Sequence, residues 1–279
     1  MKRTSSLITE AFIRLRSTSP IRSAAASPFK VDPATRKSVF FLAGRSMDSA
    51  VRAPESGGSG VKTPHQKIEL LQDFLKEGPG GWEKTWEAGN TPWDLGEATP
   101  IVVHLSETGS LPKGRALVPG CGSGYDVVAM ACPDRHVVGL DLSKTSIERS
   151  KKMFSSMPNS KYFSFLAEDF FTWKPPEQFD LIFDYTFLTA FPPEMRPSWA
   201  KRVEQLLKPG GELITLMFPL DDRDGGPPYS ISVSDYKKIL IPLGFEVASI
   251  EDNKLAVRPR KGVEKLGRWK KPFFVQSTL

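Results

Sequence analysis

The sequence contains little cysteine, little histidine and no long apolar run. Cys121 and Cys132 are the two cysteines among 279 residues, too few for a disulfide framework, so a reducing compartment is favoured. No apolar stretch reaches the roughly 18–20 residues that cross a bilayer. No metal-ligand spacing is present, and the three histidines, none of which stands in a motif, are His65, His104 and His136. We therefore expect neither a metal site nor a membrane partner.

Acidic residues are scarce at the N-terminus. Residues 1–47 hold nine basic residues against Glu10 and Asp32, a net charge of +7, so the remaining chain carries −1 of the total +6. A near-neutral remainder removes the electrostatic case for a phosphate-binding surface, and we expect no nucleic-acid partner. A basic run near the C-terminus predicts a solvated helix or tail and consists of Lys261, Lys265, Arg268, Lys270 and Lys271.

Residues 1–60 differ in composition from the rest of the chain. They are rich in Ser, Arg and Ala, which predicts a disordered leader that acts as a transit peptide and ends in a Gly/Ser linker. An amphipathic basic helix suits a mitochondrial presequence, whereas the serine content suits a plastid. An untargeted tail, or a shorter cytoplasmic form started at Met47, is the alternative. Residues 61–279 then form the folded domain.

From residue 64 onward, predicted helices and strands alternate. Strands are expected at 115–118, 136–140, 162–166, 179–185, 212–218, 245–250 and 254–258. Helices are expected at 64–77, 97–108, 124–131, 143–156, 194–207 and 233–241. This order predicts a doubly wound α/β fold, Rossmann-like, with a mostly parallel seven-stranded sheet and an N-terminal helical cover. The last two strands are predicted to form an antiparallel hairpin that turns at 251–253 and lies at the edge of the sheet.

Three polar groups follow the first three predicted strands. The glycine loop Gly120–Gly124 follows the first, Asp141 ends the second, and 168–170 (Glu-Asp-Phe) follows the third. Ligands of open α/β sheets bind outside these strand ends. A carboxylate at Asp141 can accept hydrogen bonds from ribose hydroxyls. The loop spacing G-x-G-x-G differs from the G-x-G-x-x-G of dinucleotide-binding dehydrogenases. The pattern therefore favours an adenosine site used for methyl transfer over one used for hydride transfer.

Six motifs carry a family resemblance. They are WEKTW at 82–86, TPWD at 91–94, ALVPGCG at 116–122, FDLIFDY at 179–185, LKPGGEL at 207–213 and DGGPPY at 224–229. On these motifs the chain from about Trp82 to Lys271 resembles the plant thiol/halide methyltransferases. These are also called thiocyanate methyltransferases or "harmless to ozone layer" proteins, within the thiopurine methyltransferase-like group. Val118 stands where most class I methyltransferases end the first strand with an acidic residue. The resemblance implies that this departure is usual within the group.

The resemblance implies an S-adenosylmethionine-dependent methyltransferase of class I. Positions that match cofactor contacts are Trp82, Trp86, Trp93, Gly120, Gly122, Asp141, Asp169, Phe170 and Tyr185. Trp82 and Trp86 are four residues apart and would share a helical face, where an aromatic ring can attract a sulfonium. The alternative is that these tryptophans pin down the N-terminal cover by packing alone.

The implied reaction moves a methyl group to small sulfur nucleophiles or anions, namely thiols, bisulfide, thiocyanate or halides. Methyl transfer is an in-line displacement that depends on alignment and water exclusion, and an anionic acceptor needs no general base. Tyr185 is the catalytic candidate, and the predicted acceptor pocket contains Phe187, Thr189, Arg223 and Tyr229. Arg223 could instead be solvated, and the loop 221–229 is either a lid or a rigid turn. A different small-molecule acceptor is the alternative function, and we expect a monomer or weak oligomer.

Overall fold

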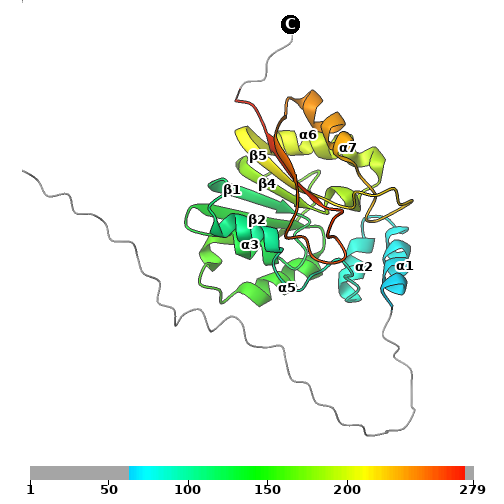
Figure 1. Ribbon diagram of the computed structural model, residues 1–279. Helices are drawn as coiled ribbons and strands as arrows, with labels where there is room; N and C mark the ends of the chain where they lie inside the picture. Colours follow the sequence, from blue (N-terminus) through cyan, green and yellow to red (C-terminus); the bar gives the residue numbers. More distant parts are fainter. Residues whose placement is uncertain (1–62, 274–279) are drawn as a thin grey trace, which may run out of the picture. The chain divides into compact units, whose positions relative to one another are not determined.

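A computed structural model describes residues 63–273 of the chain (Figure 1). Its helices are α1 (Pro64–Leu75), α2 (Gly81–Glu87), α3 (Pro100–Glu107), α4 (Tyr125–Met130), α5 (Lys144–Phe154), α6 (Arg196–Leu206) and α7 (Val233–Leu240). Its strands are β1 (Gly114–Pro119), β2 (Arg135–Asp141), β3 (Phe163–Ala167), β4 (Phe179–Tyr185), β5 (Leu207–Met217), β6 (Glu246–Asp252) and β7 (Lys265–Lys270). Short 3-10 turns are η2 (Ser160–Tyr162), η3 (Leu188–Ala190), η4 (Pro193–Met195) and η5 (Ile241–Leu243). The predicted leader at 1–60 lies outside the described residues.

The seven strands form one sheet in the order β3-β2-β1-β4-β5-β7-β6. Strands β1 to β5 pair in parallel, and β7 pairs antiparallel with both β5 and β6. The central strands are apolar runs buried along their length, as expected for parallel strands covered on both faces. The predicted doubly wound fold is therefore confirmed, and the chain reverses its direction of winding between β1 and β4.

Helices cover both faces of the sheet (Figure 1). On one face, α6 and α7 bury a core centred on Trp199 and Tyr236, which also includes Trp269 of β7. On the other face, α3, α4 and α5 bury a second core around Val102, Val127 and Ile147. Every residue named here is at most 1% exposed, so the two layers supply the hydrophobic stabilisation and leave the strand ends to hold a site.

The predicted strand at 254–258 is wrong. Residues 254–262 form turns joined by irregular backbone, and the last strand is β7, which inserts between β5 and β6 instead of forming the sheet's edge. Pro259 lacks a backbone donor and Gly262 has a φ of 88°, so this stretch cannot continue a ladder. Trp269, in contrast, is fully buried and stacks on Tyr236 with ring centroids 6.0 Å apart. Burial of this ring selects β7, and the connection from β6 is a long loop, not a tight hairpin.

The basic C-terminal run is not a solvated helix or tail, which corrects the expectation from composition. Residues 265–270 form β7, where Arg268 and Lys270 both pair with Glu212 of β5. Lys271 is 7% exposed and its Nζ donates to the carbonyl oxygen of Leu207 at 3.0 Å. Arg268, Lys270 and Lys271 therefore lie against acidic partners and the carboxyl end of α6, where they stabilise the junction between β5 and β7, while Lys261 is exposed in the loop before β7.

The N-terminal cover consists of α1 and α2, which lie side by side at one end of the sheet (Figure 1). Helix α1 begins with a capping box in which Thr63 and Gln66 satisfy each other's backbone donors. Helix α2 is tied to the start of α5, because Glu83 accepts hydrogen bonds from Ser143 and Thr145. The cover is thus attached next to the carboxyl end of β2, where Asp141 lies.

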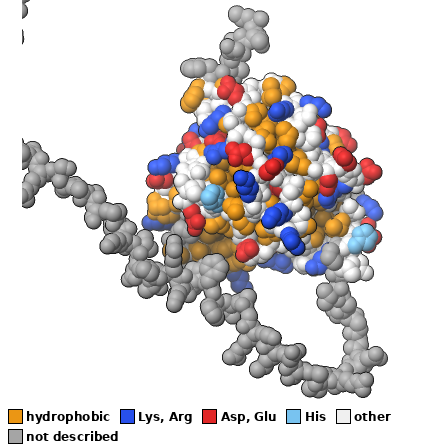
Figure 2. Space-filling model, in the orientation of Figure 1, with side chains coloured by type: hydrophobic (Ala, Val, Ile, Leu, Met, Phe, Trp, Pro, Cys, Tyr) orange, Lys and Arg blue, Asp and Glu red, His pale blue; other side chains and the backbone are white. Residues whose placement is uncertain are grey.

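The visible surface mixes charges of both signs. Figure 2 shows acidic and basic side chains interspersed on this face, with no large field of one sign. This distribution agrees with the near-neutral charge of the chain beyond residue 47. Within residues 63–273, no helix combines the length and the apolarity that a bilayer-crossing segment needs.

Candidate active site

The glycine loop after β1 turns tightly and is approached closely by aromatic side chains. Gly120 and Gly122 have φ values of 59° and 52°, in the region that favours glycine. A Cβ on Gly120 would lie 2.4 Å from Cδ2 of Phe187, and one on Gly122 would lie 3.3 Å from the Trp86 ring. The absence of side chains at these positions lets two aromatic walls, one from α2 and one from the segment after β4, approach the same turn.

Asp141 faces this loop from the end of β2. Its Oδ2 accepts a hydrogen bond from the Gly122 N–H at 2.9 Å, and its Oδ1 accepts one from the Ser143 N–H at 2.9 Å. Burial raises the pKa of Asp141 to about 6, and the nearby carboxylate of Glu83 raises it further, while the hydrogen bonds oppose the shift. The carboxylate sits beside the loop in the place the sequence predicted for a ribose partner.

A cleft that is open to solvent, with a cavity volume of about 90 Å³, runs along the glycine loop and the end of β4. Four predicted site residues line it: Trp93, Gly120, Gly122 and Tyr185. The remaining lining residues are Asp94, Leu95, Glu97, Thr99, Val118, Pro119, Cys121, Ser123, Gly124, Tyr125, Asp126, Thr186 and Arg260.

The three predicted tryptophans form one cluster beside the cleft. Trp93 packs edge-on against Trp82 at 5.6 Å and against Trp86 at 6.3 Å between ring centroids. Trp86 is 4% exposed, whereas Trp93 is half-buried and lines the cleft. The segment after Trp93 is fixed to the glycine loop by a hydrogen bond from the Ser123 hydroxyl to Asp94. The cluster therefore connects the cover to the loop, and Trp93 is its member on the cleft wall.

Asp169 and Phe170 follow β3 and do not line the cleft. Asp169 accepts a hydrogen bond from the Phe171 N–H at 2.8 Å, and Phe170 is 4% exposed and packs edge-on against Phe187. The Glu168 N–H donates to the Asp141 carbonyl at 3.0 Å, which holds the two strand ends together. Asp169 thus lies near the predicted ribose site, and Phe170 supports Phe187 from within the core.

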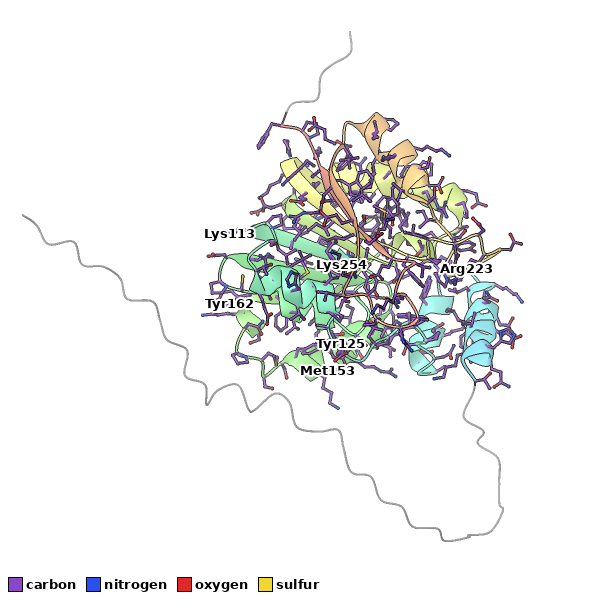
Figure 3. The ribbon with its side chains drawn as sticks, viewed as in Figure 1. Lys113, Tyr125, Met153, Tyr162, Arg223 and Lys254 are labelled. Atoms are coloured by element: carbon purple, nitrogen blue, oxygen red, sulfur yellow. The ribbon has the colours of Figure 1, made fainter. Side chains whose placement is uncertain are left out.

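The predicted acceptor residues separate into two groups. Phe187 contacts the glycine turn, and the Thr189 carbonyl accepts the Tyr229 N–H at 2.8 Å, which joins the segment after β4 to the proline-rich segment. Arg223, by contrast, is exposed and pairs with Asp221 two residues away. It lies on the loop after β5, on the side of the domain where α1 and α2 also lie (Figure 3). The structure joins the segments of Thr189 and Tyr229 and places the Arg223 guanidinium carbon 5.9 Å from the Phe218 ring centroid. None of the four predicted acceptor residues lines the cleft itself.

Arg260 is a cleft residue that sequence reasoning missed. Its side chain is 7% exposed, and its guanidinium carbon lies 4.6 Å from the Tyr185 ring centroid and 5.2 Å from that of Phe218. Its Nη2 donates to the Trp93 carbonyl at 3.1 Å, and its Nη1 is buried with no hydrogen-bond partner among the described residues. The sequence offers no spacing signal for it, since Arg260 lies in a basic stretch of the loop before β7.

The carboxylates nearest Arg260 are occupied by other partners. Asp126 accepts hydrogen bonds from the Thr99 N–H at 2.7 Å and from the Thr99 hydroxyl at 2.8 Å, and burial raises its pKa. Glu264 accepts a hydrogen bond from the Asn253 amide, and burial raises its pKa as well. Both carboxylates interact with the charge of Arg260, but neither forms an ion pair with it among the described residues, and its Nη1 keeps no hydrogen-bond partner there.

These features fit an S-adenosyl ligand. A tight glycine turn allows close approach, Asp141 offers a carboxylate for hydroxyl groups, and aromatic rings of Trp93 and Tyr185 line the cleft. Thr186 has a φ of 60°, a strained value for a β-branched residue that is typical of functional sites. The residues that would hold the ligand are Trp93, Gly120 and Gly122 of the cleft lining, together with Asp141, which is hydrogen-bonded to Gly122 behind it. Tyr185 and Arg260 line the same cleft.

Comparisons with known proteins agree with this geometry. The family model of thiopurine S-methyltransferase (TPMT) matches residues 77–272. "Probable thiol methyltransferase 2" of Arabidopsis thaliana is 74% identical over 212 residues, which cover 76% of this chain and 94% of the relative. "Thiocyanate methyltransferase 1" of Brassica oleracea is 57% identical over 220 residues, covering 79% of this chain and 96% of the relative.

Among solved structures, one described as "Conversion of a Disulfide Bond into a Thioacetal Group during Echinomycin Biosynthesis" aligns with a TM-score of 0.58. The alignment covers 71% of this chain and 93% of that chain at 22% sequence identity. At this identity the likeness concerns the fold, and it supports the doubly wound architecture described above.

Proposed function

The chain belongs to the thiopurine S-methyltransferase family of S-adenosylmethionine-dependent methyltransferases, and we propose that its acceptors are small sulfur nucleophiles and anions. Thiols, bisulfide, thiocyanate and halides make up this class. The names of the two plant relatives, a thiol and a thiocyanate methyltransferase, support the proposal. The observation that carries it is the buried guanidinium of Arg260 above the ring of Tyr185.

A buried cation with a free donor at the cleft wall favours an anionic acceptor. Arg260 keeps its Nη1 without a hydrogen-bond partner in the described part of the chain, and such a group is costly to bury unless a ligand satisfies it. Phe218 and Tyr185 supply apolar faces beside it. A small, weakly hydrated anion can accept from Arg260 and contact these rings at the same time, whereas a large acceptor would have to open the cleft.

The residues act by alignment and exclusion of water. Bound S-adenosylmethionine would supply an electrophilic methyl group, whose bond to the sulfonium would break as the acceptor bonds to the methyl carbon, with S-adenosylhomocysteine as the leaving group. Tyr185 touches the acceptor and orients it by its hydroxyl, Arg260 holds its negative charge, and the tryptophan cover with Phe187 keeps water out. Bisulfide, thiocyanate and halides already carry the attacking electron pair, and a neutral thiol would lose its proton to solvent as it is methylated, so no base is required of the chain.

Headspace detection of methylated volatiles tests the proposal. Full-length protein with S-adenosylmethionine should produce methyl derivatives from bisulfide, thiocyanate or iodide, each supplied separately. A parallel calorimetric titration with S-adenosylmethionine establishes that the protein is folded and binds the methyl donor. Donor binding without any methylated volatile would refute the acceptor class and favour a different small-molecule acceptor.

Residues 1–60 direct the protein to a mitochondrion or plastid in this proposal. Their serine-, arginine- and alanine-rich composition supports it. A fluorescent reporter fused after residue 60 should enter one of these organelles, and a second fusion that begins at Met47 should stay in the cytoplasm. A cytoplasmic signal from both fusions would refute targeting. Sedimentation of the full chain should show a monomer or weak oligomer.

A further inference from the structure

Asp184 is a buried carboxyl group directly before Tyr185 at the end of β4. It is 1% exposed, its Oδ2 accepts the indole N–H of Trp199 at 2.9 Å, and its Oδ1 accepts the Leu188 N–H at 3.3 Å. A buried carboxylate is costly even when it is hydrogen-bonded, and Asp184 is not among the residues that line the cleft. Its partners instead lie on α6 and on the segment that follows β4.

That segment, residues 186–191, is here named the acceptor loop. It starts with the strained φ of Thr186, places Phe187 against the glycine turn, and continues into η3. Its Thr189 carbonyl accepts the Tyr229 N–H at 2.8 Å. The acceptor loop therefore touches both the glycine turn and the proline-rich segment that carries Tyr229, and it follows Tyr185 directly in the chain.

We propose that Asp184 is the positioning residue of the acceptor pocket, because it fastens the acceptor loop to α6 through Leu188 and Trp199. This inference rests on the proposed function, since it concerns where the acceptor lies. Trp199 is fully buried and packs edge-on against Tyr236 of α7, so one end of the fastening is immobile. The other end is the loop's own backbone. Asp184 thus acts on the acceptor by way of Tyr185 and Phe187.

The electrostatic surroundings make the ionised form of Asp184 sensitive to pH. Burial raises the pKa of Asp184 to about 7, against the effect of its hydrogen bonds. The titratable and charged groups near it are Tyr236 of α7, whose pKa is raised, and Arg196 of α6, which pairs with Asp235. A raised carboxyl pKa contributes stability below pH 4 that is lost as pH rises through about 7. Ionisation of Asp184 as the pH rises therefore lowers the stability of the fold.

The test compares Asp184→Asn with two other variants of the full chain. Asparagine keeps an acceptor for Leu188 but turns an amide N–H toward the Trp199 donor. We expect the KM for thiocyanate to rise at least about tenfold, as for misplacement of a reacting group, with the Kd for S-adenosylmethionine within about twofold of the parent. Trp199→Phe removes the indole donor, keeps an aromatic ring, and should change KM in the same direction.

Val203→Ala is the matched control. Val203 lies one turn after Trp199 on α6 and is equally buried, so its truncation lowers stability without touching Asp184. Its KM for thiocyanate should stay at the parent value. In the parent, KM should rise as pH falls through about 7 because protonation removes the charged acceptor. In Asp184→Asn this dependence should vanish, and thermal stability should fall less between pH 5 and pH 8 than in the parent.

An unchanged KM and an unchanged pH profile in Asp184→Asn, relative to Val203→Ala, would overturn the proposal. If the parent protein methylates no small acceptor at all, the proposed function fails. Amide hydrogen exchange then tests separately whether Asp184 holds the acceptor loop in place. Faster exchange across residues 186–191 in Asp184→Asn and Trp199→Phe than in Val203→Ala would support the fastening. Equal exchange in all three variants would refute it.

Discussion

The two walls of the cleft are built in different ways. The glycine-loop wall comes from neighbouring β-α units, in which Gly122 and Asp141 are 19 residues apart and join by a direct hydrogen bond. The opposite wall joins Tyr185 of β4 to Arg260 of the loop before β7, and Arg260 in turn reaches Trp93, 167 residues away. The first wall is local in sequence, whereas the second depends on how the whole sheet is assembled.

Under the proposed function, this difference separates the recognition of the two ligands. The glycine-loop wall would bind the donor through the backbone of its tight turn and the Asp141 carboxylate. The other wall would bind the acceptor through the side chains of Tyr185, Phe218 and Arg260, which lie in three separated segments of the chain. Its shape and charge can therefore change without altering the sheet. Substitutions on the two walls should therefore affect two separable quantities, the Kd for S-adenosylmethionine and the KM for the acceptor.

The largest effect is expected from Asp141→Ala on the donor side. Removal of a charged hydrogen-bond partner costs about 1.5–3 kcal/mol, so the Kd for S-adenosylmethionine should rise about tenfold or more. Since burial raises the pKa of Asp141 to about 6, the parent's affinity should also fall as pH drops below 6. Calorimetric titration across pH 5 to 8 measures both effects. An Asp141→Ala protein with parental affinity would show that this carboxylate does not hold the ribose.

Arg260→Met should have the next largest effect, and it should fall on the acceptor. Loss of the cation should raise the KM for thiocyanate about tenfold, the scale of a lost charged hydrogen bond, while the KM for a neutral organic thiol changes less. Arg260→Lys is the matched variant, because it keeps the charge but loses the planar stacking on Tyr185. Equal changes for the anionic and the neutral acceptor would contradict charge recognition by Arg260.

A smaller effect is expected from Glu83→Gln, which loosens the cover. Glu83 binds the Thr145 hydroxyl at 2.7 Å and also accepts from Ser143, so the Kd for S-adenosylmethionine should rise about threefold, as for a weakened hydrogen bond. Because the Glu83 charge raises the pKa of Asp141, the pH midpoint of donor binding should move down. Glu87→Gln, an exposed change on the same helix, should alter neither quantity. If Glu87→Gln changed the Kd and the pH midpoint as much as Glu83→Gln does, the effect would not be specific to the hydrogen bonds of Glu83.

The smallest effect is expected from Arg223→Ala. Arg223 is exposed and pairs with Asp221, and exposed ion pairs contribute about 0–1 kcal/mol. Acceptor KM and donor Kd should both stay within about twofold of the parent, measured by the same assays. A tenfold rise in KM for thiocyanate would mean that the loop after β5 closes over the acceptor and that the comparison of the two walls must include it.

Much of the fold and the donor side could be predicted from the sequence. Strands near 115–118, 136–140 and 179–185, and the glycine loop with Asp141, follow from local apolar runs and turn residues, and the structure places them as predicted. The last strand could not be found in this way. Lys265–Lys270 alternates charged and apolar residues no more clearly than 254–258 does, and burial of Trp269 between two helices and a sheet decides between them.

The sequence by itself determined the β-α order, the glycine turn and the family, because these depend on short-range backbone geometry and on residues close together in the chain. The tertiary structure alone decided that Arg260 lies over Tyr185, that Asp184 reaches Trp199, and that Arg268 of the basic C-terminal run pairs with Glu212. These contacts join segments that are far apart in the chain, and no sequence periodicity or motif spacing predicts which of them will meet. They form because the sheet brings strand ends together, and burial then selects which charges must find a partner.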